Sequence, residues 1–477
     1  MTSAKHSEKT FLKAKRIGIF GHVGTKNLGD ETIIAAVIQN TRRWFPDAEI
    51  RAFTFQPEDT RLRHRIPAFP IRRIDSPPAT SEAAAKSNSN PAPRAPWGGR
   101  LQAILKKVPV LHPCLRALRD GISFLAGFGK EVAFLAQSRR SLHETDLLLI
   151  AGSGQLTDHS GGPWGYPYTF FKWSLLAWLT RTKLAILSVG TSWVDSPLSR
   201  FFLKFALSRA EYRSYRDENS RSQIEKWGPR GKILVTPDLA YSLIMPKTEV
   251  KVAPSSSAPI VGINPIPFFH ETMWHQADKQ IYDQYVLTQA KFAAWLIRKG
   301  YTVVFFPTQL RADPVAVNDI MQALQRTYPE LSAYRTVNPP MHSHEDLISV
   351  MSEMDFVVAA RFHGVLISHL LHKPVLAVSY HAKTADLMAQ MGQSQCALDI
   401  DACTLQALTD RFLFVESHSQ AIAGDLECRV SSRRIALDSQ YEQVFGLLQE
   451  RSALAAASIE PKAWPKEPSN ARIDHGS

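Results

Sequence analysis

The sequence has few cysteines and no long apolar run. Its four cysteines, among 477 residues, are widely separated and none forms a Cys-x-x-Cys pair. A disulfide framework or a structural zinc site is therefore not expected, and a reducing compartment fits. No stretch of about 18 apolar residues is free of charge, and the N-terminus has no apolar core of signal-peptide length. These absences predict a cytoplasmic protein that does not span a membrane.

Signatures of nucleic-acid binding are also missing. The formal net charge is +12, an excess compatible with nucleic acid, an anionic membrane surface or an acidic small substrate. The basic residues are scattered rather than gathered with interleaved aromatics, and no RRM, KH or zinc-finger pattern occurs. We therefore expect no nucleic-acid partner and favour an acidic small molecule.

The sequence has the composition of a globular protein and the alternating strand and helix patterns of an α/β fold. Hydrophobic residues make up 44% and charged residues 21%, and the chain is too long for one core. Short apolar runs alternate with helical patterns, which is typical of βα units on a parallel sheet. The polar, Pro- and Ser-rich segment 246–259 is the predicted linker. We expect two doubly wound, Rossmann-like domains, 1–245 and 260–455, that face a cleft.

Three segments depart from this alternation of strand and helix patterns. Residues 76–99 are rich in Pro, Ala and Ser with few large apolar side chains, which predicts a disordered insertion because little surface can be buried. Residues 101–142 form a basic helical region, which is either a solvated face on a packed helix or a surface for an anionic membrane. Residues 456–477 are expected to form a disordered tail.

Two glycine-containing loops follow predicted strands of the first domain. The first, GHVGTKNLGDE, opens a helix, where glycines permit a close ligand and the helix N-terminus offers free N–H groups. It is neither G-x-G-x-x-G nor a P-loop, so no dinucleotide or P-loop nucleotide is indicated. Asp30 in it either caps the helix or faces a ligand. The second loop, AGSGQLTD, repeats the design with Gly152 and Gly154, and its Asp158 either faces the cleft or caps a turn.

The second domain carries a cation and a histidine two positions apart. Arg361 and His363 follow the buried strand 355–359, and residues i and i+2 of an extended segment share a face. A guanidinium binds carboxylate or phosphate through two N–H groups, and an imidazole titrates near neutral pH. Arg216 and Lys383 also follow strands at helix starts, where a cation suggests a nearby anion. Surface exposure or local ion pairs are the alternatives, but the four residues together predict an anion pocket.

These motifs, in this order, resemble those of the polysaccharide pyruvyl transferase family. The similarity spans residues 16–392, interrupted by the insertion, and Ser153 stands where the family usually has glycine. The motifs that carry it are Asn27-x-Gly29-Asp30, Gly152-Ser153-Gly154 with Asp158, Arg216-Asp217 with Ser220, Asp238 with Ala240, and Arg361-x-His363 with Pro374, Tyr380 and Lys383.

The resemblance implies a GT-B-like fold and a defined reaction. Members transfer a pyruvyl group from phosphoenolpyruvate to a sugar of an exopolysaccharide or cell-surface glycan precursor, forming a ketal and releasing phosphate. Phosphoenolpyruvate is then a co-substrate, and no metal or other cofactor is expected. For this reaction we expect His363 as the acid or base, because an imidazole titrates near neutral pH, with Asp30 or Asp158 as the carboxylate that takes a hydroxyl proton. The implied substrate-binding residues are Arg361, Arg216, Lys383, Asn27, Gly29, Gly152 and Gly154.

Two alternatives remain open from the sequence. The same fold serves GT-B glycosyltransferases that use a nucleotide-sugar donor. A non-catalytic scaffold of polysaccharide assembly, held to a membrane surface by residues 101–142, is the second. The acceptor can be lipid-linked, which would bring the protein to the inner face of the membrane. Loop aromatics such as Trp164 and Trp274 are suited to stacking on sugar rings or to packing.

Overall fold

The computed structural model describes residues 14–21, 23–73, 111–159, 161–192, 194–229, 231–245, 258–274, 276–332 and 336–457. For residues 111–126, 332 and 450–457 only the backbone is described. The predicted insertion at 76–99, most of the predicted linker at 246–259 and the predicted tail beyond residue 457 lie outside the described residues. The predictions for those segments therefore stay predictions.

The first domain is built on seven parallel strands in the order β3-β2-β1-β4-β5-β6-β7. Side chains alternate along the strands: Leu147 and Leu149 of β4 belong to one apolar cluster, while Leu148 and Ile150 belong to the other. The sheet is thus buried on both faces, as parallel sheets require. The strands are β1 (Arg16–Phe20), β2 (Glu49–Thr54), β3 (Ala68–Pro70), β4 (Leu147–Ala151), β5 (Lys183–Val189), β6 (Tyr212–Tyr215) and β7 (Leu234–Val235).

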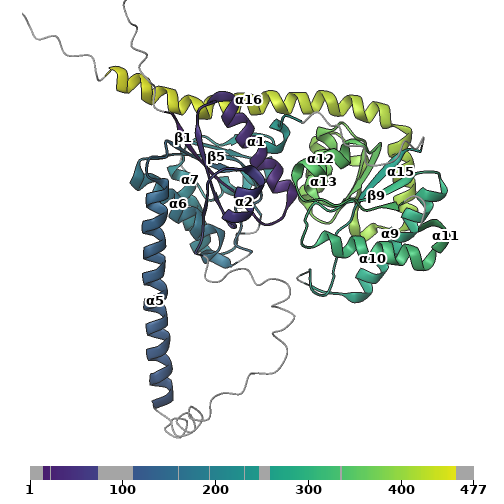
Figure 1. The fold of residues 1–477 in the computed structure, drawn as a ribbon, viewed down its shortest axis with the longest axis horizontal. Helices are drawn as coiled ribbons and strands as arrows, with labels where there is room; N and C mark the ends of the chain where they lie inside the picture. The colour runs from purple at the N-terminus through teal and green to yellow at the C-terminus, as the bar shows by residue number, and fades with distance from the viewer. Residues whose placement is uncertain are drawn as a thin grey trace, which may run out of the picture.

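Helices cover both faces of this sheet. Helix α1 and the 3-10 helix η2 pack in the first cluster, and α6 and α7 in the second. Helix α5 contacts α6 with its C-terminal part and extends away from the domain (Figure 1). The helices are α1 (Leu28–Trp44), α2 (Pro57–His64), α5 (Leu111–Leu142), η1 (Gly162–Trp164), α6 (Tyr166–Thr180), α7 (Pro197–Arg209), α8 (Glu218–Glu225) and η2 (Leu239–Ser242).

The second domain repeats the same topology with six parallel strands in the order β10-β9-β8-β11-β12-β13. The strands are β8 (Ile260–Asn264), β9 (Thr302–Phe305), β10 (Thr336–Val337), β11 (Phe356–Ala359), β12 (Val375–Ser379) and β13 (Ala397–Asp399). The helices are α9 (Lys279–Arg298), α10 (Asp313–Thr327), α11 (Pro329–Ser332), α12 (His344–Ser352), α13 (Phe362–Leu370), α14 (Ala382–Gln390), η3 (Ser394–Cys396), η4 (Ile400–Ala402), α15 (Leu405–Ser417) and α16 (Ser419–Ala457).

Each sheet reverses its strand order once, between β1 and β4 and between β8 and β11. Phe20 is in register with Ile150, and Ala359 with Asn264, so the loops after each pair leave the sheet at the same level. Ligands of open α/β sheets bind at such switch points, outside the carboxyl ends of the strands. The predicted α/β class with two parallel sheets is confirmed, and the glycine-containing loops and the Arg361 segment all lie at these points.

The domains meet through backbone and through a returning helix. The Leu28 N–H donates to the Thr308 carbonyl (2.8 Å) and the Leu310 N–H to the Lys26 carbonyl (2.9 Å). Helix α16 leaves the second domain and runs across the first (Figure 1). Its buried Gln440 accepts from the hydroxyls of Ser214 (2.5 Å) and Thr236 (2.7 Å). The last helix in sequence is therefore part of the core of the first domain.

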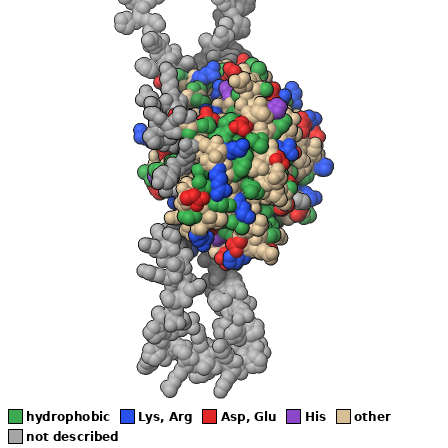
Figure 2. Space-filling model, turned by 90° about the vertical axis from the view of Figure 1, so that its right-hand side faces the viewer, with side chains coloured by type: hydrophobic (Ala, Val, Ile, Leu, Met, Phe, Trp, Pro, Cys, Tyr) green, Lys and Arg blue, Asp and Glu red, His purple; other side chains and the backbone are tan. Residues whose placement is uncertain are grey.

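The surface carries both charges. On the face drawn in Figure 2, which is formed by the second domain, Lys and Arg side chains are interspersed with Asp and Glu. Among the described residues, no helix is both long and apolar enough to cross a bilayer. Contact of the basic helical region with a membrane stays a prediction.

The Gln440 contacts yield a first prediction. Gln440→Ala removes the acceptor of two buried hydroxyls, Ser214 and Tyr212, and of the half-buried Thr236 hydroxyl. It also removes the donor to the Ser188 hydroxyl (3.3 Å). We expect the free energy of unfolding to fall by about 2–4 kcal/mol, since each buried polar group left unpaired costs about 1–3 kcal/mol. Urea denaturation measures it. The control is Gln443→Ala on the exposed side of the same helix, for which we expect a change within about 0.5 kcal/mol. Equal losses of stability in Gln440→Ala and Gln443→Ala would contradict the packing of α16 on the first domain.

Candidate active site

A cavity of about 230 Å³ lies between the two domains. The first domain contributes residues that follow β1, β4 and β6, and the second contributes residues that follow β9, β11 and β12. The cavity is thus assembled from carboxyl ends of strands in both sheets. Its lining residues are Asn27, Asp30, Ser153, Gly154, Arg216, Thr308, Gln309, Arg361, Phe362, His363, Tyr380 and Lys383.

Arg361 is held in place by a buried carboxylate. It is the N-cap of α13, and its Nε and Nη2 donate to Asp313 Oδ1 at 2.9 and 2.5 Å. Asp313 is fully buried. Burial acts to lower the pKa of Arg361, but the charge of Asp313, the nearby Tyr380 and the hydrogen bonds to both together raise the pKa above its ordinary value. The guanidinium is therefore permanently charged and fixed in direction.

Asp313 is in turn fixed by the backbone. It is the first residue of α10, and its Oδ2 accepts from the N–H groups of Thr308 (3.0 Å) and Gln309 (2.8 Å). These two residues line the cavity after β9. The sequence did not predict Asp313 as a site residue. An Asp before Pro at a helix start indicates only a helix terminus, and nothing in the pattern links it to Arg361.

Two further cations lie on the ring of Phe362. The Arg216 guanidinium is 4.7 Å and the Lys383 ammonium 6.0 Å from its centroid. Arg216 is also near two carboxylates, at 3.5 Å from Asp217 and 3.6 Å from Asp238, which are long for charged hydrogen bonds. Neither carboxylate holds Arg216 as closely as Asp313 holds Arg361. The structure brings together the four residues that were predicted to form an anion pocket. All of them line this cavity: Arg216, Arg361, His363 and Lys383.

His363 lies in the first turn of α13 and is 9% exposed. Its Nε2 is buried and has no hydrogen-bond partner among the described residues. Burial lowers the pKa of His363, and the positive charges of Arg216 and Lys383 act in the same direction, against the opposing influence of Asp238 and Asp30. The lowered pKa makes the imidazole neutral near pH 7.

The start of α1 closes the cavity from the first domain. Asn27 caps α1 by accepting from the Gly29 N–H (3.2 Å), and its amide donates to Asp30 Oδ2 (2.8 Å). Gly29 touches His363: a Cβ added to Gly29 would lie 2.1 Å from the imidazole Cγ. Glycine at this position is what permits the histidine of one domain to pack on the helix of the other.

The loop after β4 supplies only part of what was predicted. Ser153 and Gly154 line the cavity, while Gly152 (φ +43°) lies just behind them against Ile33. Asp158 is not among the lining residues, and its carboxylate accepts from the N–H groups of Asp195 and Ser196. Its predicted role as a base stays a prediction, with Asp30 the carboxylate at the cavity.

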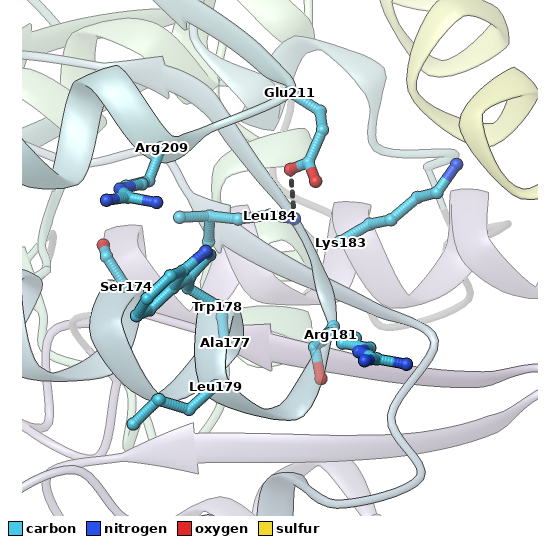
Figure 3. A pocket seen from close by; sticks show the side chains of 10 residues that line it. Ser174, Ala177, Trp178, Leu179, Arg181, Lys183, Leu184, Arg209 and Glu211 are labelled. Atoms are coloured by element: carbon cyan, nitrogen blue, oxygen red, sulfur yellow. Dashed lines mark hydrogen bonds between the residues drawn. The ribbon is translucent and has the colours of Figure 1, made fainter.

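A more voluminous cavity, about 520 Å³, lies elsewhere (Figure 3). It is at the amino ends of β5 and β6, where Glu211 accepts from the Leu184 N–H (2.7 Å) and Arg209 lies 4.6 Å from the Trp178 ring. This is the edge of the sheet opposite the switch point, where ligands of such sheets do not ordinarily bind. The interdomain cavity is therefore the candidate active site. No cluster of metal-ligating side chains occurs in the described parts of the chain.

Comparison with protein families matches residues 27–382 to polysaccharide pyruvyl transferase. The matched segment covers well over half of the chain and contains every cavity residue except Lys383. The chain belongs to the polysaccharide pyruvyl transferase family. It is therefore a transferase by family, as predicted. Among proteins with curated descriptions, none matches the sequence.

The solved structures similar to this pyruvyl transferase family member share its fold at low identity. UDP-GlcNAc 2-epimerase from Neisseria meningitidis bound to UDP-GlcNAc has a TM-score of 0.52 and 10% identity, over 91% of this chain and 100% of that chain. UDP-GlcNAc 2-epimerase from Methanocaldococcus jannaschii has a TM-score of 0.50 and 9% identity, over 83% and 91%. These are GT-B-type folds, so the predicted GT-B-like architecture is confirmed.

The contact between Gly29 and His363 yields a second prediction. Gly29→Ala forces a methyl group into the imidazole, and overpacking of this kind costs about 1–3 kcal/mol. We expect a lower free energy of unfolding, measured by urea denaturation, because either α1 or His363 must shift. The control is Gly154→Ala, whose added Cβ meets no atom within 4 Å. Wild-type stability in Gly29→Ala would show that the two domains do not approach this closely.

Proposed function

We propose that the protein transfers a pyruvyl group from phosphoenolpyruvate to a sugar of a cell-surface polysaccharide precursor, forming a cyclic ketal. The observation that carries the proposal is the convergence of Arg216, Arg361 and Lys383 with a buried histidine in the interdomain cavity. Phosphoenolpyruvate bears a carboxylate and a phosphate ester on the same carbon. Two anionic groups in a small molecule match three cations in a small cavity.

The size of the cavity supports this donor over a nucleotide-sugar. At about 230 Å³ it is smaller than the roughly 300–1,000 Å³ of a drug-sized ligand site. A guanidinium that presents parallel N–H groups suits a carboxylate or phosphate, while an ammonium acts as a point charge. Under the proposal, Arg361 and Lys383 hold the donor, with Arg216 assisting.

The proposed reaction begins with protonation of the donor's methylene carbon, which becomes a methyl group. Positive charge develops at the adjacent carbon, and the oxygen of a sugar hydroxyl attacks it. The bond to phosphate breaks, and a second hydroxyl of the same sugar closes the ketal. The fixed cations stabilise the phosphate as it leaves without having to reorganise.

The protons balance within the site. Two hydroxyl protons are released, one is gained by the methylene carbon, and the leaving phosphate carries the other. His363 is the group proposed to deliver the proton to carbon, and Asp30 the carboxylate proposed to receive a hydroxyl proton. Because a bound anion offsets the charges of Arg216 and Lys383, it raises the pKa of His363 from its lowered value. A larger fraction of His363 is then in the acid form when the donor is present.

Arg361 yields the third prediction. Arg361→Ala is expected to weaken phosphoenolpyruvate binding by roughly 10- to 100-fold, because a charged hydrogen bond is worth about 1.5–3 kcal/mol. Isothermal titration measures it. Since the change leaves Asp313 unpaired, Arg361→Lys is measured beside it: it keeps the charge and loses the parallel N–H groups.

The control for charge is Arg311→Ala, an exposed arginine that does not line the cavity. It removes the same net charge and should leave the dissociation constant unchanged. If Arg361→Ala and Arg361→Lys both bound the donor with wild-type affinity, Arg361 would not hold the donor.

His363 yields the fourth prediction. His363→Ala is expected to reduce the turnover rate by about 10²–10⁴-fold, the usual contribution of a general acid or base, with donor affinity largely retained. Phosphate release from phosphoenolpyruvate measures the turnover. A variant that turns over at the wild-type rate would remove His363 from the reaction.

The pH dependence of donor binding tests the same residue. Because the pKa of His363 is lowered in the free protein and an anion raises it, donor binding should take up protons, and affinity should rise as pH falls. The rise ends below the lowered pKa, where the free imidazole is already charged. Titration in buffers of different ionisation enthalpy counts the protons. The phosphate of the donor contributes equally in His363→Ala, so the uptake should be smaller in that variant.

A further inference from the structure

A second cavity adjoins the candidate active site. It has a volume of about 540 Å³ and lies wholly in the second domain, over the carboxyl ends of β12 and β13. Its walls come from the loop between β8 and α9, the start of α14 and the residues that follow β13. The two cavities share the side chain of Tyr380, whose hydroxyl is 3.5 Å from Arg361 Nη1.

One wall of this cavity is aromatic. The Trp274 ring is partly exposed and lies 6.0 Å from Phe269, stacked at 30°, and 5.7 Å from Tyr380 at 69°. Phe268 is buried beneath them, 5.4 Å from Trp274. Trp274 is thus supported by other rings, remains partly exposed where it lines the cavity, and lies beside the residue that both cavities share.

The loop that carries this wall is held in an unfavourable backbone conformation. Phe269 has φ +60°, which a bulky side chain rarely adopts and which costs about 1–3 kcal/mol. The Phe269 carbonyl accepts from the Asp278 N–H (2.9 Å) at the start of α9. Such strain persists only where the surroundings determine it. The aromatic wall is therefore held in place by the fold around it.

The charge of this cavity is opposite to that of the first. Its described lining includes the carboxylates of Asp399 and Asp401 and no Lys or Arg. Burial, with the charges of Lys383 and Arg216, lowers the pKa of His381, so this lining imidazole is neutral near pH 7. An anion is attracted to the first cavity and repelled from the second. A neutral ligand with many hydroxyls is suited to the second, because carboxylates accept several hydrogen bonds.

We propose that this second cavity binds the saccharide acceptor. The apolar face of a sugar ring lies on Trp274, its hydroxyls donate to Asp399 and Asp401, and the pair of hydroxyls that reacts reaches past Tyr380 to the donor. Pockets of this kind combine apolar surface with a few placed polar groups. The inference rests on the proposed function only for the reaction that the bound saccharide undergoes. The binding of a saccharide in this cavity does not depend on it.

The probes are the p-nitrophenyl glycosides of glucose, galactose, mannose and N-acetylmannosamine. With phosphoenolpyruvate as donor, Trp274→Ala should raise KM for the glycoside that is used by about tenfold, an effect of the size expected for an aromatic contact. The dissociation constant of phosphoenolpyruvate should not change. Trp274→Phe should restore most of the affinity, and Asp401→Asn should raise KM with the aromatic wall intact.

The control is Trp164→Ala. Trp164 is 66% exposed on the first domain and lines neither cavity, so KM for the glycoside should stay at the wild-type value. Thermal unfolding of each variant verifies that the fold is retained. A wild-type KM in both Trp274→Ala and Asp401→Asn would overturn the inference.

Saturation-transfer NMR with the same glycosides detects binding without turnover. A signal in the wild type that is lost in Trp274→Ala supports the inference even if phosphoenolpyruvate is not the donor, and that result separates the two proposals. Equal signals in both proteins, or no signal for any glycoside in the wild type, would overturn it. The inference would also be overturned if UDP displaced the glycosides from the wild type and Trp274→Ala abolished UDP binding, because the cavity would then be a nucleotide site.

Discussion

The buried ion pair between Arg361 and Asp313 determines how the site is assembled. Asp313 holds Arg361 with one oxygen and the N–H groups of Thr308 and Gln309 with the other. The Thr308 carbonyl accepts from Leu28 at the start of α1, so one carboxylate links the cation, the loop after β9 and the opposite domain. Burying two charges is costly, and such a pair often adds little net stability. Its effect here is to fix where a guanidinium points.

Duplicated topology explains why one cavity can draw on both domains. In each sheet the strand order reverses between the first and fourth strands, and the loops that follow these strands diverge there. The first domain presents the N-terminus of α1, and the second presents its cations and His363. Because Gly29 has no side chain, the histidine packs directly on that helix start. The interface and the site are therefore built by the same contact.

The sequence predicted the site residues that directly follow strands. It did not predict residues such as Asp313, which reach the site only through contacts between distant segments. Arg361 and Lys383 converge because parallel strands end at one edge of their sheet, and Arg216 joins them because the carboxyl ends of both sheets face one cleft, as the pattern predicts. Asp313 lies 48 positions from Arg361, and nothing local indicates that they meet. The return of α16 to the first domain was not predicted either, since an apolar stripe shows that a helix face is buried without showing which domain buries it.

Under the proposed function, the arrangement of charge also orders the events. In the free protein burial and the charges of Arg216 and Lys383 lower the pKa of His363, so the group proposed as the acid is neutral near pH 7. An anionic donor removes that constraint by neutralising the cations, while the carboxylates of Asp399 and Asp401 keep it out of the neighbouring cavity. Binding of the donor thereby leads His363 to take up a proton from solvent, and the neutral ligand approaches the donor past Tyr380. A site built this way discriminates between its two substrates by charge before either makes a specific contact.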